Sequence, residues 1–243
     1  TVDLGADARD VASAFNTISG TTGVLAAAIT RARLTFASAA TYTFTLEGKS
    51  STFSTVTATL TNTSDLTAIK DAINAVSGAT GITAALTTSK AGINIVQEEG
   101  YDIIIGDVTG GNATVTAMDR SEELNASTIS LTNGGNDSTA VMGQVALSSH
   151  QAFTVTPGNS ANHFSTGTAE ESSTINSISS ISLTTKSGAT NSLSVIDGAL
   201  AMVSEIRSSM GAADNRLKST IDNLSNIAVN AQASLSAIEA CKA

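Results

Sequence analysis

The 243-residue sequence has no tryptophan, one cysteine, one proline and only 3% aromatic residues. A single cysteine, Cys241, excludes an intrachain disulfide framework, and with no other cysteine or histidine at ligand spacing we expect a free thiol. Enzyme pockets are usually lined by aromatic side chains, so their scarcity argues against an enzyme. Serine and threonine are abundant instead, which is typical of extended surface proteins.

Basic residues are also scarce, with 12 Lys and Arg against 21 Asp and Glu and a net charge of −9. Nucleic-acid-binding proteins gather positive charge in a patch or stripe, so we expect no nucleic-acid partner. The most apolar run, residues 23–29, is far shorter than the ~20 residues of a membrane span, so we expect no membrane insertion. Charges near the start replace the apolar core of a cleavable signal peptide. Because an initiator methionine is also absent, we expect the sequence to be part of a longer protein.

Few residues could carry chemistry. The histidines are His150 and His163, and no Gly-x-Ser-x-Gly elbow frames a serine beside them. A Ser-His-Asp triad is defined by geometry, so that alternative stays open. Acids that could surround calcium lack the spacing of a known calcium loop, and solvated turn acids are the more common alternative. We predict no catalytic residue, no cofactor and no metal ligand. The acids in question are Glu98, Glu99, Asp102 and Asp107.

The strongest periodic pattern lies in residues 191–243. Apolar residues recur every three or four positions from Leu193 to Ile238 without a proline, which predicts a continuous α-helix. At ~1.5 Å per residue this helix is roughly 70 Å long, more than the diameter of a small domain. The mean step approaches the ~3.5-residue repeat of a coiled coil. The alternative is a long amphipathic helix packed on its own domain.

No other part of the sequence supplies a second helix of this length. We therefore predict a partner helix, from a neighbouring molecule or from the same protein. Without such a partner the helix should fray or pair with another copy, because isolated helices gain little stability in water. The seam that meets the partner comprises Leu200, Val203, Ile206, Met210, Leu217, Ile221 and Leu224.

Residues 36–118 predict an α+β module. Tyr42, Phe44 and Leu46 alternate with threonines, a turn follows at residues 47–50, and residues 52–60 resume the alternation, which predicts a hairpin. A short helix with apolar residues from Leu66 to Val76 follows, with N-capping chemistry at residues 62–64. Three short strands are predicted at residues 82–86, 93–96 and 103–105.

The segments around this module have weaker patterns. Residues 1–11 alternate as a strand, residues 10–18 predict one or two helical turns, and residues 20–23 break them. Residues 119–174 are polar and rich in glycine and asparagine, with strand-like pieces that predict a second β-rich region. Residues 175–183 lead back into the long helix. The strand-like pieces are residues 127–131, 141–147 and 153–156.

Both parts resemble bacterial flagellin. The long helix, over residues 176–236, resembles the C-terminal core helix of that family through Ile196-Asp197, Ala199-Leu200, Met210-Gly211-Ala212, Asn215-Arg216-Leu217 and Asn223-Leu224. Flagellins usually continue with Arg and Asp, whereas Ala237, Ala240, Cys241 and Lys242 follow here, so the sequence looks truncated or altered after about Ser236. The α+β module resembles the insert motif of flagellins and other flagellar axial proteins through Ser64-Asp65-Leu66, Ala72-Ile73-Asn74 and Gly81-Ile82-Thr83-Ala84. Residues 5–8 resemble the strand that closes the N-terminal half of the flagellin core.

The resemblance implies an α+β chain with a long C-terminal core helix and β-rich outer domains. Residues 1–35 would be the N-terminal side of the filament core, and residues 175–243 the return to that core. Between them lie an insert module, residues 36–118, and a second outer β-rich region, residues 119–174.

The resemblance also implies a structural subunit of the bacterial flagellar filament, exported and located outside the cell. Its partners would be other flagellin subunits and its own N-terminal helix. Polar residues of the long helix would touch neighbouring subunits, although a solvated helix face is the commoner role. Three alternatives remain: an outer domain that binds an extracellular polysaccharide, a contact with a host receptor, and a hook-associated or cap axial protein. The polar residues are Arg207, Asn215, Arg216 and Asn223.

Overall fold

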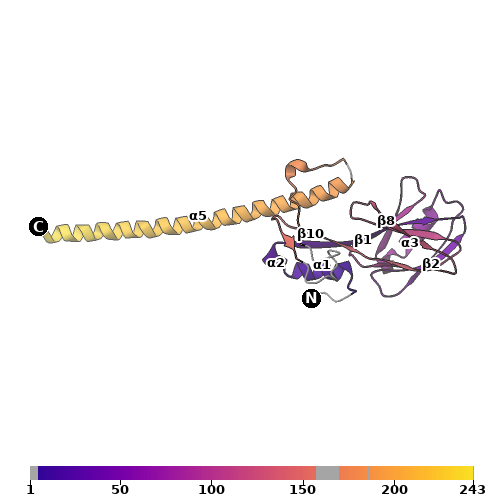
Figure 1. Cartoon of the computed structure of the whole chain (residues 1–243). Coiled ribbons are helices and arrows are strands. Elements are labelled where there is room, and N and C mark those ends of the chain that lie inside the picture. The colour runs from indigo at the N-terminus through magenta and orange to yellow at the C-terminus, as the bar shows by residue number, and fades with distance from the viewer. Residues whose placement is uncertain (1–4, 157–169, 185, 243) are drawn as a thin grey trace. The chain divides into compact units, whose positions relative to one another are not determined.

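The computed structural model describes residues 5–156, 170–184 and 186–242. It has the expected α+β composition and divides into two compact units, Thr1–Ser192 and Leu193–Ala243. The described part of the first unit holds antiparallel sheets and short helices (Figure 1). Residues 175–183 lead through the short 3-10 helix η1 (Ile178–Ser180) to helix α5 (Lys186–Lys242), most of which forms the second unit.

Strand β1 (Leu25–Phe36) organises the larger sheet. Its first five residues pair with β10 (Gln144–Ser148), and its later residues pair with two further strands, one on each side. A second sheet has four strands and a third has two. The larger sheet is completed by β5 (Ile93–Gln97), β7 (Ala113–Met118), β4 (Ile82–Leu86) and β8 (Leu124–Leu131). The second consists of β3 (Ser54–Thr59), β2 (Thr41–Glu47), β6 (Ile103–Thr109) and β9 (Thr139–Val141), and the third of β11 (Thr154–Val155) and β12 (Glu171–Ser172).

The predicted hairpin is confirmed. Strands β2 and β3 pair antiparallel, and the aromatic and aliphatic residues that alternate along β2 are buried. The threonines between them face outward, where the Thr41 and Thr59 hydroxyls lie 2.9 Å apart. Because side chains alternate across a strand, this pattern directs one face of the second sheet into the core. The buried residues are Tyr42, Phe44 and Leu46.

Helix α3 (Thr67–Ala75) closes this core and is followed by one turn of helix, α4 (Ser77–Thr80). Ile69 and Ile73 on α3 are fully buried. The helix begins later than its sequence suggests: the side chain that accepts a hydrogen bond at its start is Asp65, from the Thr67 N–H at 3.0 Å. The prediction that residues 62–64 cap the helix is therefore wrong.

The predicted N-terminal strand is wrong for residues 8–11, which belong to helix α1 (Ala8–Thr17). Ala8, Val11 and Ala12 are buried, and this spacing of three and four residues places them on one face of a helix that contacts β1. The helical turns predicted for residues 10–18 are confirmed. The break predicted at residues 20–23 is wrong for residues 20–22, which belong to helix α2 (Ser19–Thr22). The first four residues of that predicted strand lie outside the described residues.

Three described strands have no counterpart in the sequence prediction: β1, β7 and the two-residue β12. β1 begins with an alanine run that lacks clear alternation, yet it is held by partner strands along its whole length. β7 was missed as well, although it pairs with β1 and β8. Tertiary pairing overrides a weak local preference in β1 and β7. The piece predicted at residues 141–147 divides into β9 and β10, which join different sheets.

The sheets cross the segment boundaries drawn from sequence. β1 extends over residues 25–36, and β8, β9 and β10 pair with strands from the earlier segments. Contacts therefore group all described residues up to Ser192 into one unit. The assignment of the four segments to a filament core and an outer part stays a prediction.

A backbone hydrogen bond and a cation–π contact connect α1 with the loop after β5. The Arg9 N–H donates to the Gly100 carbonyl at 3.1 Å, and the Arg9 guanidinium lies 4.8 Å from the centre of the Tyr101 ring. The Gly143 N–H donates to the Asp102 carboxylate at 3.1 Å. Burial raises the pKa of Asp102, the charge of Asp7 adds to this, and the Gly143 hydrogen bond opposes it. Burial also raises the pKa of Asp7.

These raised pKa values predict a loss of stability as the pH rises. The folded state binds protons at Asp7 and Asp102 more tightly than the unfolded state, so their favourable contribution is present below the ordinary pKa of 3.8 and is lost above it. Asp102→Asn keeps an oxygen that accepts from Gly143 but cannot ionise. We expect the substitution to raise the free energy of unfolding, relative to the unchanged protein, by more at pH 7 than at pH 4. Urea unfolding at both pH values measures this, and an equal difference at both would contradict it.

Candidate self-association surface

Helix α5 extends over 57 residues without a proline. At ~1.5 Å per residue it is roughly 85 Å long. Its polar side chains add local contacts: Asp214 and Lys218 form an ion pair of 3.1 Å one turn apart, and the Thr220 hydroxyl donates to the Arg216 carbonyl at 2.8 Å. The continuous helix predicted from the apolar periodicity is confirmed. The next longest helix in the described part of the chain, α1, has 10 residues.

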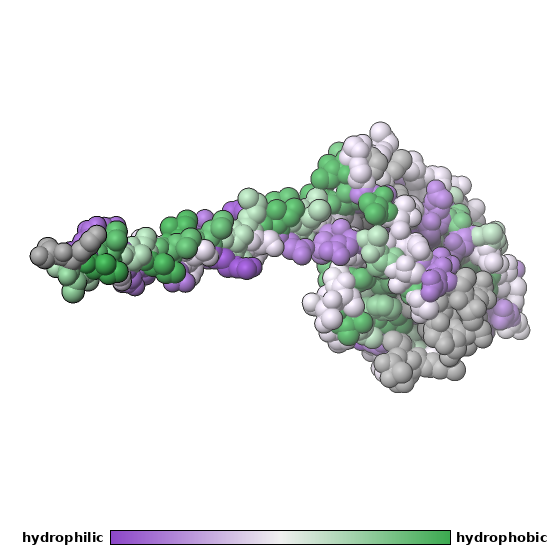
Figure 2. Space-filling model, turned by 60° about the vertical axis from the view of Figure 1, so that its left-hand side comes forward, coloured by the Kyte–Doolittle hydropathy of each residue, from purple (hydrophilic) through white to green (hydrophobic). Residues whose placement is uncertain are grey.

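The residues predicted to form the seam are all exposed on α5. Their exposed fractions range from 48% for Ile206 to 67% for Met210. On a helix of ~3.6 residues per turn they occupy roughly one third of the circumference. Figure 2 shows apolar surface along the length of the helix. The second unit therefore presents a continuous apolar stripe that no other described residue of that unit covers.

Large apolar side chains also lie outside the seam. Met202 and Ile227 are 50% and 56% exposed, and their positions place them roughly a quarter turn from the middle of the seam. Val229, 64% exposed, lies near the opposite edge of the seam. The sequence prediction omitted these residues because it followed only the best-fitting stripe. A helix that is apolar on several sides is normally buried on several sides, which indicates more than one neighbour.

The four predicted polar contact residues do not share one side of the helix. Arg216 and Asn223 are seven residues apart and lie close to the same side, with Asn215 adjacent. Arg207 follows Val203 by four residues, which places it along the seam. All four are exposed. Their predicted role in subunit contacts stays a prediction.

The arrangement suits association by apolar burial. Complete burial of a large aliphatic side chain contributes about 1.5–3 kcal/mol, and roughly half of each seam residue is still exposed. Burial of seven such residues against one partner helix would stabilise the association by several kcal/mol. A lone helix of this kind has little independent stability, so association and helix formation should be coupled.

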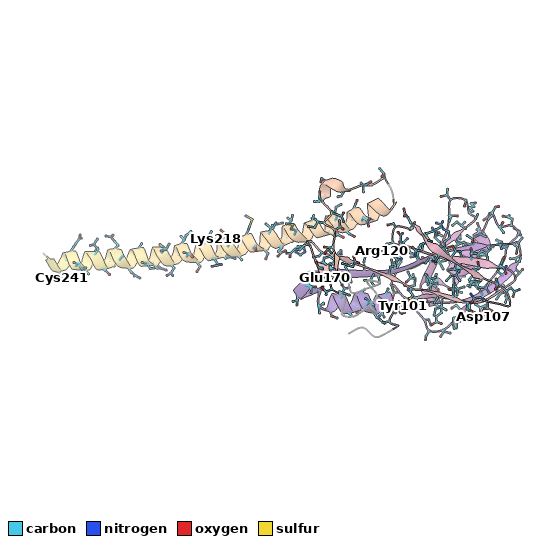
Figure 3. All side chains as sticks on the ribbon, viewed as in Figure 1. Tyr101, Asp107, Arg120, Glu170, Lys218 and Cys241 are labelled. Atoms are coloured by element: carbon cyan, nitrogen blue, oxygen red, sulfur yellow. The ribbon has the colours of Figure 1, made fainter. Side chains whose placement is uncertain are left out.

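The other sequence candidates are not brought together. Glu99 forms an ion pair with Lys49 at 2.7 Å, whereas Asp102 accepts from Gly143. Asp107 lies on β6 and is labelled in Figure 3. Within the described ranges no three His, Cys, Asp or Glu side chains gather as a metal site, and no helix is long and apolar enough to cross a membrane. His163 lies outside the described residues.

Cys241 and the histidine that the structure describes have separate surroundings. Cys241 is an exposed free thiol near the end of α5 (Figure 3). His150 lies beside Gly23, where a side-chain methyl added to the glycine would come 3.6 Å from its imidazole ring. The catalytic alternative gains no support from this placement.

Two family models match the chain. The bacterial flagellin C-terminal helical region matches residues 193–241, and the flagellin hook IN motif matches residues 43–98. The first match covers nearly all of the second unit, including the whole seam. The second begins in β2 and extends just beyond β5.

Curated relatives agree with these matches. The B-type flagellin of Pseudomonas aeruginosa is 33% identical over 180 residues, which cover 71% of this chain and 36% of that protein. Polar flagellin C of Vibrio parahaemolyticus is 44% identical over 63 residues, and flagellin A of Vibrio cholerae is 42% identical over 62. Each of these two alignments covers 26% of this chain and 16% of the relative, so the chain spans about a third or less of the proteins it matches. Two regions that match flagellin family models, together with an alignment to a flagellin across most of the sequence, place the chain in the bacterial flagellin family.

Proposed function

We propose that the protein is a structural subunit of the bacterial flagellar filament, located outside the cell. The subunits associate when the α5 seam is buried against helices of neighbouring subunits and against an N-terminal helix of the same protein. Arg207, along the seam, and Asn215, Arg216 and Asn223, on other sides of α5, contact neighbouring subunits. The function is structural, with no catalytic step.

The exposed seam is the observation that carries this proposal. An exposed apolar stripe some tens of ångströms long promotes aggregation of a monomer, whereas in a polymer it is buried between subunits and drives assembly. The additional apolar side chains at Met202, Ile227 and Val229 supply contacts to more than one neighbour, as a filament wall requires. Both features lie in the region that matches the flagellin C-terminal model.

We assign the two β-rich segments, residues 36–118 and 119–174, to the outer surface of the filament. Many of the apolar side chains of residues 36–118 are buried in one cluster, which Leu131 and Val141 of the second segment join, and the threonine rows of β2 and β3 face solvent. Residues 1–35 and 175–243 belong to the core. Strand β1 connects the two parts.

The alternatives have less support. Sugar-binding surfaces commonly use exposed aromatic rings. Phe36, Tyr42 and Phe44 are buried together here, and Phe53, at 53%, is the one aromatic side chain of the described residues that is more than half exposed. This lowers the case for a polysaccharide ligand, and no described feature favours a host receptor. A hook-associated or cap protein is disfavoured because the helix matches the flagellin C-terminal model and the relatives are flagellins.

Electron microscopy tests the proposal. The full-length protein, after salt-induced or seeded assembly, should form helical filaments, while residues 1–243 of this sequence alone should not. Full-length protein that stays unassembled under both conditions would contradict the filament function.

A further inference from the structure

The chain contains a short sequence twice. Asn-x-x-Ser-Gly-x-Thr-Gly occurs at residues 16–23 and again at residues 74–81. Eight of the fourteen positions from Ala14 to Ala27 are identical to those 58 positions later. The first occurrence spans the end of α1 and the whole of α2, and the second spans the end of α3 and the whole of α4. The flagellin hook IN motif match includes the second occurrence and not the first.

Both occurrences form the same hydrogen bonds to the strand that follows. The Asn16 side-chain amide donates to the Ala26 carbonyl and accepts from the Ala26 N–H, each at 2.9 Å. The Asn74 amide makes the same pair of bonds with Ala84, at 3.0 and 2.8 Å. Each alanine lies ten positions after its asparagine. Each asparagine thus holds the end of a helix against the next strand.

The turn between helix and strand is also the same in both occurrences. A threonine hydroxyl donates to the carbonyl four residues before it, at 3.0 Å in both turns, and accepts from the N–H two residues after it, at 3.3 Å in the first and 3.2 Å in the second. These threonines are Thr22 and Thr80. A left-handed glycine follows each of them, Gly23 at φ 67° and Gly81 at φ 69°. The repeated sequence therefore corresponds to a repeated local structure.

The similarity continues into the sheets. β4 pairs antiparallel with β5, and the first five residues of β1 pair antiparallel with β10. In both, the alanine held by the asparagine pairs with an aliphatic residue, and the side chain two positions after that residue lies beside the left-handed glycine. A Cβ added to the glycine would come 3.0 Å from that side chain beside β4 and 3.9 Å from it beside β1. The pairs are Ala84 with Ile95 and Ala26 with Leu147, and the side chains beside the glycines are Gln97 and Ser149.

One copy of this arrangement is inserted into the other. We call α1, α2, the first five residues of β1 and β10 the first copy, and α3, α4, β4 and β5 the second copy. All of the second copy lies in the chain between β1 and β10. The paired strands of the first copy are therefore more than a hundred positions apart, and a continuous sequence match can include all of the second copy but not all of the first. Figure 1 shows α1, α2 and β10 together along β1.

We propose that the first copy is a second module of the IN type, discontinuous in the sequence, and that the module matched by the family model is inserted into it. Asn16 has the role in the first module that Asn74 has in the second. Because the asparagine joins helix to strand and the strand is paired with its neighbour, the helices, the start of β1 and β10 open as one unit. The inference goes beyond the proposed filament function and does not depend on it.

Amide hydrogen exchange of the full-length protein and of its Asn16→Ala variant tests this proposal. Exchange in the first copy, including β10, should become at least about tenfold faster, because the substitution removes both hydrogen bonds that hold the helix to the strand. Exchange in the second copy should change much less. Asn74→Ala should give the reverse, with faster exchange in α3, α4, β4 and β5.

Two further substitutions complete the experiment. Asn125→Ala, at an exposed position of β8, is the control and should alter neither copy. Asn16→Asp and Asn74→Asp keep an oxygen that accepts from the alanine N–H but lose the donor to its carbonyl. They should give a smaller increase in the same segments as the alanine variants, and they serve if an alanine variant does not fold.

Three results would overturn the proposal. One is faster exchange confined to α1 and α2 in the Asn16 variants, because these helices would then be an addition to β1 and not part of a module with β10. Another is an equal increase in both copies after either substitution, which would mean that they open as one unit. The third is unchanged exchange in the first copy. None of these results depends on filament assembly, so the exchange experiment and the microscopy can fail independently.

Discussion

Replacing Met210 and Ile221 together by glutamate is expected to abolish filament assembly of the full-length protein. Both side chains lie in the seam and are more than 60% exposed on α5 alone, so an assembled partner would bury most of their surface. Moving a carboxylate into such an interface without a counter-charge costs several kcal/mol. Two such changes should raise the critical concentration for assembly by more than about 10³-fold, because ~1.4 kcal/mol corresponds to tenfold.

A matched control separates the seam from the charge. Ser208→Glu with Ser219→Glu adds the same charge at the same spacing of eleven residues, on the side of α5 opposite the seam. Sedimentation after seeded assembly measures the critical concentration of both double variants. Ser219 lies one turn from Asn215 and one turn from Asn223, so the control should raise the critical concentration, but far less than the seam variant does. An equal rise in the two variants would contradict the role of the seam. Thermal unfolding should be unchanged for the sheets, which contain none of these four residues.

Patterns contained within one element could be predicted well from the sequence. The alternation of Tyr42, Phe44 and Leu46 fixes which side of β2 is buried, and the steps of three and four residues define α5. Each depends on a local periodicity that the backbone geometry imposes. The same is true of Ile69 and Ile73 on α3.

Features that depend on distant partners could not be predicted in the same way. The alanine-rich start of β1 becomes a strand because residues 144–148 pair with it, and these lie more than a hundred positions later. Arg207 was grouped with Asn215 by residue type, whereas its position on the helix places it along the seam. The sequence Asn-x-x-Ser-Gly-x-Thr-Gly occurs at residues 16–23 and again at residues 74–81, but a search for internal repeats is needed to find it.

Gly110→Ala is expected to cause the largest loss of stability of any single methyl addition in the first unit. Gly110 has a φ of 92°, and a Cβ placed there would lie 1.9 Å from the carbonyl oxygen of Thr41 and 2.8 Å from its carbonyl carbon. These are backbone atoms of β2, which is held by β3 on one side and by β6 on the other. The clash can be relieved only by separating the turn after β6 from β2.

Gly134→Ala is the control for this change because it isolates the effect of backbone conformation. Gly134 has a φ of 77°, and a Cβ there would meet no atom within 4 Å. A non-glycine residue in this region costs about 1–2 kcal/mol, so that is the expected loss at Gly134. Gly110→Ala adds the steric conflict and should cost at least about 4 kcal/mol, a large part of the 5–15 kcal/mol that stabilises a typical domain.

Urea unfolding of the two glycine variants distinguishes these contributions. Because the loss at Gly110 arises from contact with β2, it should be accompanied by faster amide exchange in β2 and β6, where the strands must separate. Exchange should change less in β10, which pairs with the other end of β1, and in α1, which contacts β1. Equal losses at Gly110 and Gly134 would mean that the turn moves away from Thr41 at little cost. The close contact between Gly110 and β2 would then not be needed for the stability of the second sheet.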